Sequence, residues 1–269
     1  MKGVTVADSV THLGKQARGT VAVCGSHGGL YAAWLAARAG VRAVVLNDAG
    51  IGRHSAGIAG VLWLAGLGIP AVAIDYRSAR IADGADMMKS GVVSTVNEVA
   101  AKRGCLPGHT CKQVVACLLE ESEEKAEAKI PEIGETRVRI ASTGHREVWA
   151  IDSASLVRAE DRRAIVVTGS HGALMGGKPD KVLAAVDVFA AIFNDAGGGK
   201  DGAGYTRLPV LDQRGVAGLT VSNQTARIGD GRSTYETGVV SRINETARRL
   251  ELREGMSTRE AVARMLGLG

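Results

Sequence analysis

The stretch TVAVCGSHGG at residues 20–29 has a close counterpart, AIVVTGSHGA, at residues 164–173. In both, a short apolar run rich in β-branched residues leads directly into glycine, which predicts a buried strand that ends in a tight loop. The residues that follow in the first copy, 28–39, are rich in alanine and predict a helix. A buried strand followed by a helix is typical of an α/β fold.

Three further motifs recur in the same order after GSHG. NDAG occupies residues 47–50 and 194–197, ARI-x-DG residues 79–84 and 226–231, and GVVS-x-x-NE residues 91–98 and 238–245. Because the spacing from NDAG onward is the same in both sets, we interpret the chain as a tandem duplication. The predicted parts are a first α/β repeat at residues 1–119, a charged linker and hairpin at 120–147, and a second α/β repeat at 148–269.

Each repeat is predicted to be a three-layer, Rossmann-like unit, and a pseudo-twofold axis is expected to relate the two. Apolar strands at residues 20–24, 42–47 and 70–75 alternate with predicted helices at 28–39, 56–67 and 89–103. Continuous apolar strands between helices indicate a parallel sheet with both faces covered. Thr110 with Gln113, and Ser257 with Glu260, have the spacing of capping boxes that open one more helix per repeat.

The linker has two predicted parts. ESEEKAEAK at residues 121–129 is a solvated charge run. RVRIA and EVWAI then flank STGHR, which predicts a β-hairpin outside the two repeats.

Composition excludes several classes of protein. With 45% hydrophobic and 23% charged residues the chain is not disordered, and four cysteines among 269 residues do not make a disulfide scaffold. No apolar run approaches the roughly 18 residues of a membrane span, and the first residues carry no apolar signal segment, so we expect a cytoplasmic protein with no membrane partner. The net charge is +5, but the basic residues are scattered and only 3% of residues are aromatic, which argues against nucleic-acid binding.

The loops at the carboxyl ends of parallel strands gather at one edge of a sheet, where ligands bind. Each recurring motif follows a predicted strand, so its polar residues should lie at that rim, and the GSHG and NDAG loops of both repeats are expected to face a shared cleft. The predicted catalytic residues are His27, His171, Asp48 and Asp195. The predicted substrate-binding residues are Ser26, Ser170, Asn47, Asn194, Gly50, Gly52, Gly197, Gly199, Arg80 and Arg227.

Each of these assignments has a structural alternative. The histidines would move a proton or tie their loop to a carbonyl group. The aspartates would orient a histidine or act as a base, or else form Asx turns. The arginines and glycine N–H groups would hold the negative charge of a substrate, whereas ion pairs with Asp83 and Asp230 would instead occupy the arginines.

These residues predict a cofactor-independent hydrolase of a small anionic or amide-bearing metabolite. The alternatives are an isomerase or lyase that works by proton transfer, and a non-catalytic module that binds a phosphate or carboxylate. No metal site is expected, because CxxC, HxH and HExxH spacings do not occur. Cys24, which matches Thr168, is predicted to be a buried core residue rather than a catalytic thiol. The expected partner is a small-molecule substrate, and a homo-oligomer is compatible with the sequence.

Overall fold

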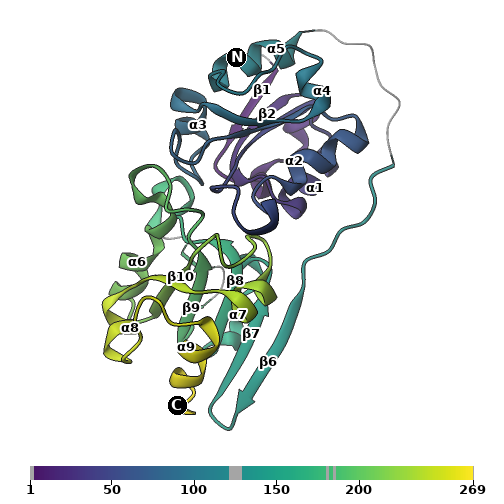
Figure 1. Ribbon diagram of the computed structural model, residues 1–269. Helices are drawn as coiled ribbons and strands as arrows, with labels where there is room; N and C mark the ends of the chain where they lie inside the picture. The colour runs from purple at the N-terminus through teal and green to yellow at the C-terminus, as the bar shows by residue number, and fades with distance from the viewer. Residues whose placement is uncertain (1–2, 121–128, 180–181, 184–185, 269) are drawn as a thin grey trace. The chain divides into compact units, whose positions relative to one another are not determined.

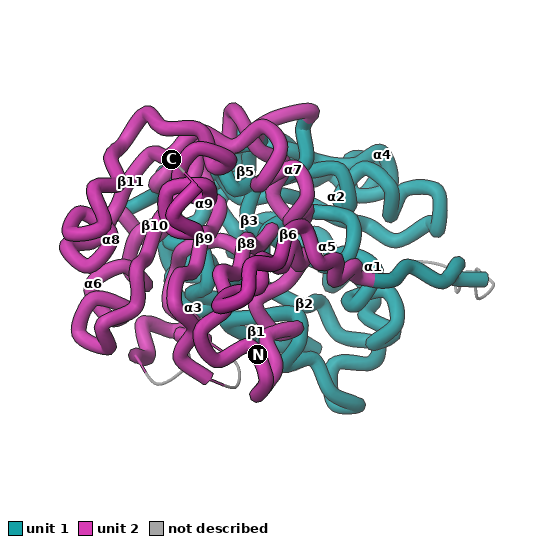
Figure 2. The backbone as a smooth tube through the Cα atoms, turned by 90° about the horizontal axis from the view of Figure 1, so that it is seen from below, with its two compact units in different colours: residues 1–51, 55–134, 199–201 teal, residues 52–54, 135–198, 202–269 magenta. Residues whose placement is uncertain are grey.

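The computed structural model describes residues 3–120, 129–179, 182–183 and 186–268. The chain forms two compact units, coloured separately in Figure 2. The first unit comprises residues 1–51, 55–134 and 199–201, and the second comprises residues 52–54, 135–198 and 202–269. Each unit therefore includes three residues from the segment that follows the NDAG motif of the other repeat.

The first unit is built on a five-stranded sheet whose strands lie side by side in chain order. The strands are β1 (Val4–Ala7), β2 (Val21–His27), β3 (Ala43–Asn47), β4 (Ala71–Ile74) and β5 (Val93–Val96). Strands β1 to β4 are parallel, and β5 is antiparallel to β4. This sequential order differs from the reversed order of a doubly wound Rossmann sheet.

Helices cover both faces of the first sheet. Strand β2 alternates between the two faces: Ala22 and Cys24 pack with α1 (Leu30–Arg38) and α2 (Ala59–Trp63). These two helices lie side by side in Figure 1. Val21 and Val23 face α3 (Gly84–Ser90) and α5 (Cys111–Leu119). The buried residues of α1 are alanines, and α2 buries Gly60. Because these side chains are small, the two helices can approach the sheet and each other closely.

The second unit has a six-stranded sheet in the order β11-β10-β9-β8-β7-β6. The strands are β6 (Arg137–Thr143), β7 (Arg146–Ile151), β8 (Ile165–His171), β9 (Ala190–Asn194), β10 (Ala217–Val221) and β11 (Val240–Ile243). Strands β7 to β10 are parallel, and β6 and β11 are antiparallel edge strands. Strands β7 to β11 thus follow the order and directions of β1 to β5.

The predicted hairpin at the linker is confirmed, but its expected position outside the repeats is wrong. Strands β6 and β7 form the hairpin, and β7 is at the same time the parallel neighbour of β8. Val148 is fully buried, so the hairpin is part of the sheet and its core. Residues 121–128 of the predicted charge run lie outside the described residues.

The helices of the second unit follow those of the first, with one difference. They are α6 (Arg207–Gln213), α7 (Gly231–Thr237), α8 (Glu245–Arg249) and α9 (Thr258–Met265). Where the first unit has α1, the described residues after β8 form a short 3-10 helix, Met175–Gly177. Gly176 and Gly177 have φ angles of 57° and 69° there, a backbone that an α-helix does not contain.

The predicted helix over residues 89–103 is wrong. This segment holds the end of α3, the antiparallel strand β5, and the short helix α4 (Glu98–Ala101). The β-branched run Val92–Val96 favours a strand once Gly91 has ended α3. Both predicted capping boxes are confirmed, at Thr110 with Gln113 and at Ser257 with Glu260. Among the described residues, no helix has the length and apolar character needed to cross a membrane.

A buried asparagine in each unit, Asn97 or Asn244, joins a strand of the sheet to one helix before it and one helix after it in the chain. The Asn97 side chain donates to the carbonyls of Val61 and Ile69 at 3.1 and 2.9 Å. Its Oδ1 accepts the N–H groups of Ala71 and Ala100 at 3.1 and 2.9 Å. Asn244 makes the same four kinds of contact in the second unit. The recurring NE motif is therefore a structural clasp, because every polar atom of the amide is satisfied inside the protein.

Replacing Asn97 or Asn244 by alanine should lower the free energy of unfolding by about 2–4 kcal/mol, because buried backbone groups lose their partners. Glu98, exposed at the start of α4, provides the control: Glu98→Ala should change it by less than about 0.5 kcal/mol. Chemical denaturation measures both. Equal stability of Asn97→Ala and Glu98→Ala would show that the clasp contributes little.

Candidate functional site

The GSHG motif lies at the carboxyl end of β2 and of β8, and its first glycine is required by close packing. A Cβ on Gly25 would lie 2.5 Å from the Asp83 nitrogen and 2.7 Å from the Asp8 carbonyl oxygen. Gly169 is confined in the same way by Asp230 and Asp152. The Gly25 carbonyl also accepts the Ala82 N–H at 2.7 Å. In each unit, the segments after the first and fourth parallel strands thus meet the end of the second parallel strand.

The serine of GSHG holds a neighbouring loop in place. Ser26 Oγ accepts the Val10 N–H at 3.0 Å and is buried. Ser170 Oγ accepts the Ala154 N–H at 2.9 Å at the matching place. The two hydroxyls therefore tie the loop after β1 to the end of β2, and the loop after β7 to the end of β8.

The histidine of GSHG is a neutral imidazole with one nitrogen bound to its own loop. His27 Nδ1 accepts the Gly29 N–H at 3.1 Å, and His171 Nδ1 accepts the Ala173 N–H at 3.3 Å. Burial lowers the pKa of His27 to about 4, so the ring is uncharged at neutral pH. Because Nδ1 accepts, the proton lies on Nε2, which is a hydrogen-bond donor. The loop-tying alternative thus holds with the direction reversed: the ring accepts an N–H instead of donating to a carbonyl.

Asn47 and Asp48, which end β3, hold the NDAG turn and the loop beyond it. Asn47 Oδ1 accepts the Ala49 N–H at 2.9 Å, while its Nδ2 donates to the Ala79 carbonyl at 3.2 Å. Asp48 Oδ1 accepts two N–H groups, from Gly50 at 2.9 Å and Tyr76 at 3.0 Å. The Asx-turn interpretation of this motif is therefore present in the structure.

The second unit repeats these bonds. Asn194 binds Ala196 and Ala226, and Asp195 Oδ1 accepts the N–H groups of Gly197 and Asn223, both at 2.9 Å. The N–H groups of Gly50 and Gly197, predicted to hold a substrate, thus bind a carboxylate of the protein itself. Both of the later glycines lie close to a backbone carbonyl. A Cβ on Gly52 would lie 2.9 Å from the Asn223 oxygen, and a Cβ on Gly199 would lie 3.3 Å from the Tyr76 oxygen.

The turn after NDAG has an uncommon backbone. Four consecutive residues after each of the two aspartates have positive φ, at positions 49–52 and 196–199. Ile51, a β-branched residue that is 40% exposed, has a φ of 60°. Side chains of this type strongly disfavour that conformation, and strained backbone of this kind is concentrated at functional sites.

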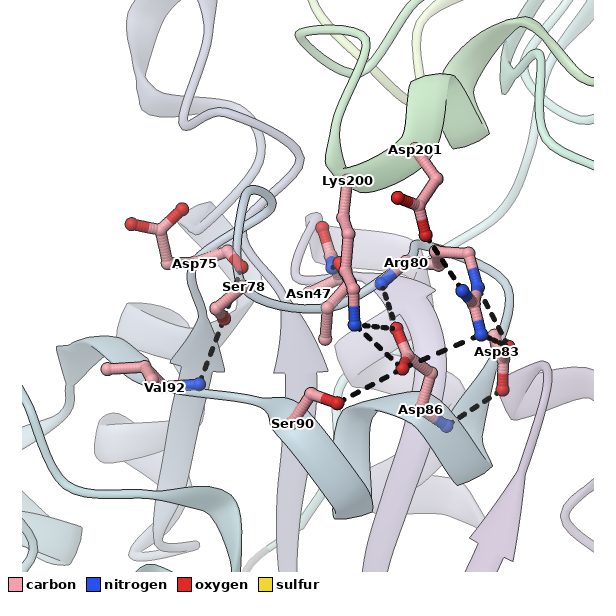
Figure 3. Close-up of polar contacts among 11 residues, drawn as sticks. Asn47, Asp75, Ser78, Arg80, Asp83, Asp86, Ser90, Val92, Lys200 and Asp201 are labelled. Atoms are coloured by element: carbon pink, nitrogen blue, oxygen red, sulfur yellow. Dashed lines mark hydrogen bonds and ion pairs between the residues drawn. The ribbon is translucent and has the colours of Figure 1, made fainter.

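Arg80 is the centre of an ion-pair cluster in the first unit (Figure 3). Its guanidinium binds Asp83 at 3.1 Å and Asp201 at 2.9 Å, and lies 3.5 Å from Asp86. Lys200 Nζ binds both oxygens of Asp86, at 2.9 and 3.1 Å. The ion-pair alternative is therefore present for Arg80, whose charge is balanced inside the unit.

Arg227 has a simpler environment in the second unit. Its Nη2 binds Asp230 at 2.5 Å, and its side chain is 48% exposed. Asp230 Oδ1 accepts the Ser233 N–H at 2.8 Å at the start of α7, as Asp83 does for Asp86 at the start of α3. The two arginines thus share a scaffold but differ in their charged neighbours.

Sequence reasoning missed Asp86 and Lys200. Asp86 lies in the first turn of α3 and is only 6% exposed. The residue at the matching position of the second repeat is Ser233. The difference between Asp86 and Ser233, inside a segment that otherwise recurs, could have indicated a special role for Asp86. The contact between Lys200 and Asp86 joins residues 114 positions apart, and no local pattern indicates it.

Cys24, next to the GSHG motif, is not a reactive thiol, and the described residues contain no cluster of side chains placed to hold a metal ion. Cys24 is fully buried, and burial raises its pKa to about 12, so the thiol stays protonated. Over the part of the chain that the structure describes, no group of three or more histidine, cysteine, aspartate or glutamate side chains is placed to hold a metal ion.

Comparisons with known proteins return no match: no family model, no curated protein and no solved structure matches the chain. The chemistry of the rim is therefore the basis for a proposed function.

Asp86 and Asp48 should give stability opposite dependences on pH. For Asp86, burial raises the pKa, but hydrogen bonds from the Arg80 N–H and Lys200 outweigh burial and lower it overall. Its stabilising effect is thus complete above the unfolded pKa of about 3.9 and is lost as the pH falls through the lower, folded pKa. For Asp48, burial raises the pKa overall, so wild-type protein gains stability as the pH falls through that raised pKa.

The variants Asp86→Asn and Asp48→Asn isolate these two effects, since asparagine keeps one acceptor oxygen. Denaturation at several pH values between about 3 and 7 should show that the wild type's stability relative to Asp86→Asn decreases towards low pH. Relative to Asp48→Asn it should increase. The same slope for both variants would contradict the assignment.

Proposed function

We propose that the protein is a cofactor-independent enzyme of small-molecule metabolism that acts on an anionic or amide-bearing metabolite by acid–base chemistry. Hydrolysis is the leading reaction, and isomerisation or elimination by proton transfer would use the same groups. The observation that carries the proposal is the pair of histidines at the carboxyl ends of β2 and β8, His27 and His171, whose Nδ1 atoms each accept an N–H of their own loop. A neutral imidazole whose Nε2 carries the proton suits hydrogen bonding to an oxygen that becomes negative during the reaction.

The surroundings of these histidines support the proposal. Asp48 directly follows β3, the strand next to β2, and the Gly28 N–H donates to the carbonyl of the preceding Asn47 at 2.8 Å. Burial raises the pKa of the Asp48 carboxyl, which favours a role in proton transfer. The strained residues 49–52 follow directly, as do residues 196–199 after Asp195.

The proposal includes a tandem duplication of a three-layer unit that is Rossmann-like in alternating parallel strands with helices, although its strand order is sequential. It is supported by the equal order and directions of β1–β5 and β7–β11. It is also supported by matching side-chain bonds at Ser26 and Ser170, Asn47 and Asn194, and Asn97 and Asn244. Independent origins would not reproduce so many bonds in the same order along the chain.

Binding of a carboxylate or phosphate without turnover is the second candidate function. The observation that favours it is that Ser26, Asp48 and Gly50 all form bonds within the protein. In that case these groups hold the loops in place and take no part in a reaction, and the arginines bind the anionic group of the ligand.

Substitution of the histidines separates the two functions. A thermal-shift screen of metabolites identifies a ligand, and mass spectrometry then measures its turnover by the full chain. His27→Gln or His171→Gln should lower the rate about 10²- to 10⁴-fold with the fold preserved. His145→Gln, in the exposed turn of the β6–β7 hairpin, is the control and should have no effect. If both rim variants fold and keep more than about half the rate, binding without histidine chemistry becomes the better conclusion.

A further inference from the structure

In the first unit, the protein places one of its own carboxylates between two cations. Asp86 Oδ2 accepts the Arg80 N–H at 2.8 Å, and both of its oxygens bind Lys200 Nζ (Figure 3). The Arg80 guanidinium lies 3.5 Å from Asp86 Oδ1. This position is thus a small anion site, and a side chain occupies it.

In the second unit, the same position holds a serine. Ser233 Oγ accepts the Arg227 N–H at 3.0 Å, as Asp86 does for Arg80, and the Ser233 N–H binds Asp230 at 2.8 Å, as Asp86 binds Asp83. The hydroxyl reproduces one oxygen of the carboxylate. The second oxygen, and the negative charge, have no counterpart in Ser233.

The second cation is also present in the second unit. Arg53 matches Lys200: its N–H donates to the Asn223 carbonyl at 2.7 Å, as the Lys200 N–H donates to the Tyr76 carbonyl at 2.8 Å. Among the described residues, the Arg53 guanidinium has no hydrogen-bond or ion-pair partner. Arginine also presents a planar fork that binds two oxygens, which lysine does not.

The charges at matching positions differ accordingly. In the first unit, Arg80 and Lys200 face three carboxylates. In the second unit, the cations at the matching positions are Arg227 and Arg53. The three carboxylates are replaced there by Asp230, Ser233 and His54, so only one carboxylate remains. This set of positions therefore carries an uncompensated positive charge, partly exposed through Arg227.

We propose that the second unit binds the anionic group of a small metabolite between Arg53 and Arg227, where Asp86 supplies a carboxylate in the first unit. The group is one that presents two oxygens, namely a carboxylate or a phosphate. The inference deepens the proposed function, because it identifies what anchors the metabolite, yet the binding itself requires no turnover.

NMR titration of the ¹⁵N-labelled full chain tests the site with sodium acetate and inorganic phosphate as probes, with sodium chloride holding the ionic strength constant. We expect saturable shifts of the amides at residues 227–233, with a dissociation constant of roughly 1–10 mM. The tighter of the two anions identifies the anchoring group. The absence of saturable shifts with both anions overturns the proposal.

Variants then locate the binding. Arg53→Gln and Arg227→Gln should each weaken it at least about tenfold, whereas Arg248→Gln, an exposed charge-matched control on α8, should not. Ser233→Asp should fill the site with a carboxylate and abolish binding. Asp86→Ser should add a second set of saturable shifts at residues 80–86. Unchanged binding in Arg53→Gln and Arg227→Gln overturns the proposal even if Ser233→Asp fails to fold.

The same measurements distinguish this site from the histidine mechanism. His27→Gln and His171→Gln should still bind the anion with wild-type affinity. If they also keep their turnover, the mechanism fails and the anion site stands. If they lose turnover but acetate and phosphate do not bind the wild type, the mechanism stands and the anion site fails.

Discussion

One buried carboxylate per unit holds the rim together. Asp48 and Asp195 each accept an N–H from the turn after their own strand and another from the loop after the next strand. A buried carboxylate requires such donors, and buried N–H groups require such an acceptor. If either loop moved away, the carboxylate would lose one donor and a backbone N–H would lose its acceptor. The glycines at 57 and 204 complete this arrangement, because a Cβ there would lie within 2.1 Å of the Asp48 or Asp195 carbonyl oxygen.

This frame explains how two nearly equal scaffolds carry unequal chemistry. Bonds from Ser26, Asn47, Asp48 and Asn97 to the backbone recur with little change in the second unit, so they fix the path of the loops. The side chains that project from those loops are less constrained. Asp86 and Ser233 share the same backbone contacts but differ in charge. Lys200 and Arg53 also share a backbone contact and the same charge, but differ in the shape of the cationic group. Function can therefore diverge at the rim without disturbing the sheet.

Much of the fold could be predicted from local patterns, since GSHG follows a buried strand and the two capping boxes fix helix starts. Residues 89–103 could not, because apolar residues there satisfy either a helix or a strand, and the pairing of β5 with β4 decided between them. The motif residues were correctly expected at the rim. Their bonds were not, since Asp48 binds Tyr76, 28 positions away, and Asp86 binds Lys200, 114 positions away. Sequence gives the residue types at an edge, whereas tertiary contacts decide which of them are already engaged.

The distribution of cysteine gives the protein a built-in probe of its own opening. All four cysteines, at positions 24, 105, 111 and 117, lie in the first unit, and the second unit has none. Burial raises the pKa of Cys111 to about 12 and of Cys105 to about 11, as for Cys24. Thiolate at pH 8 is then scarcer by about three to four orders of magnitude than thiol, so disulfide reagents reach these sulfurs chiefly through transient exposure of the core. The exchange rates of Cys24, Cys105 and Cys111 therefore report the opening of the first unit without any engineered label, and the second unit contributes no thiol signal.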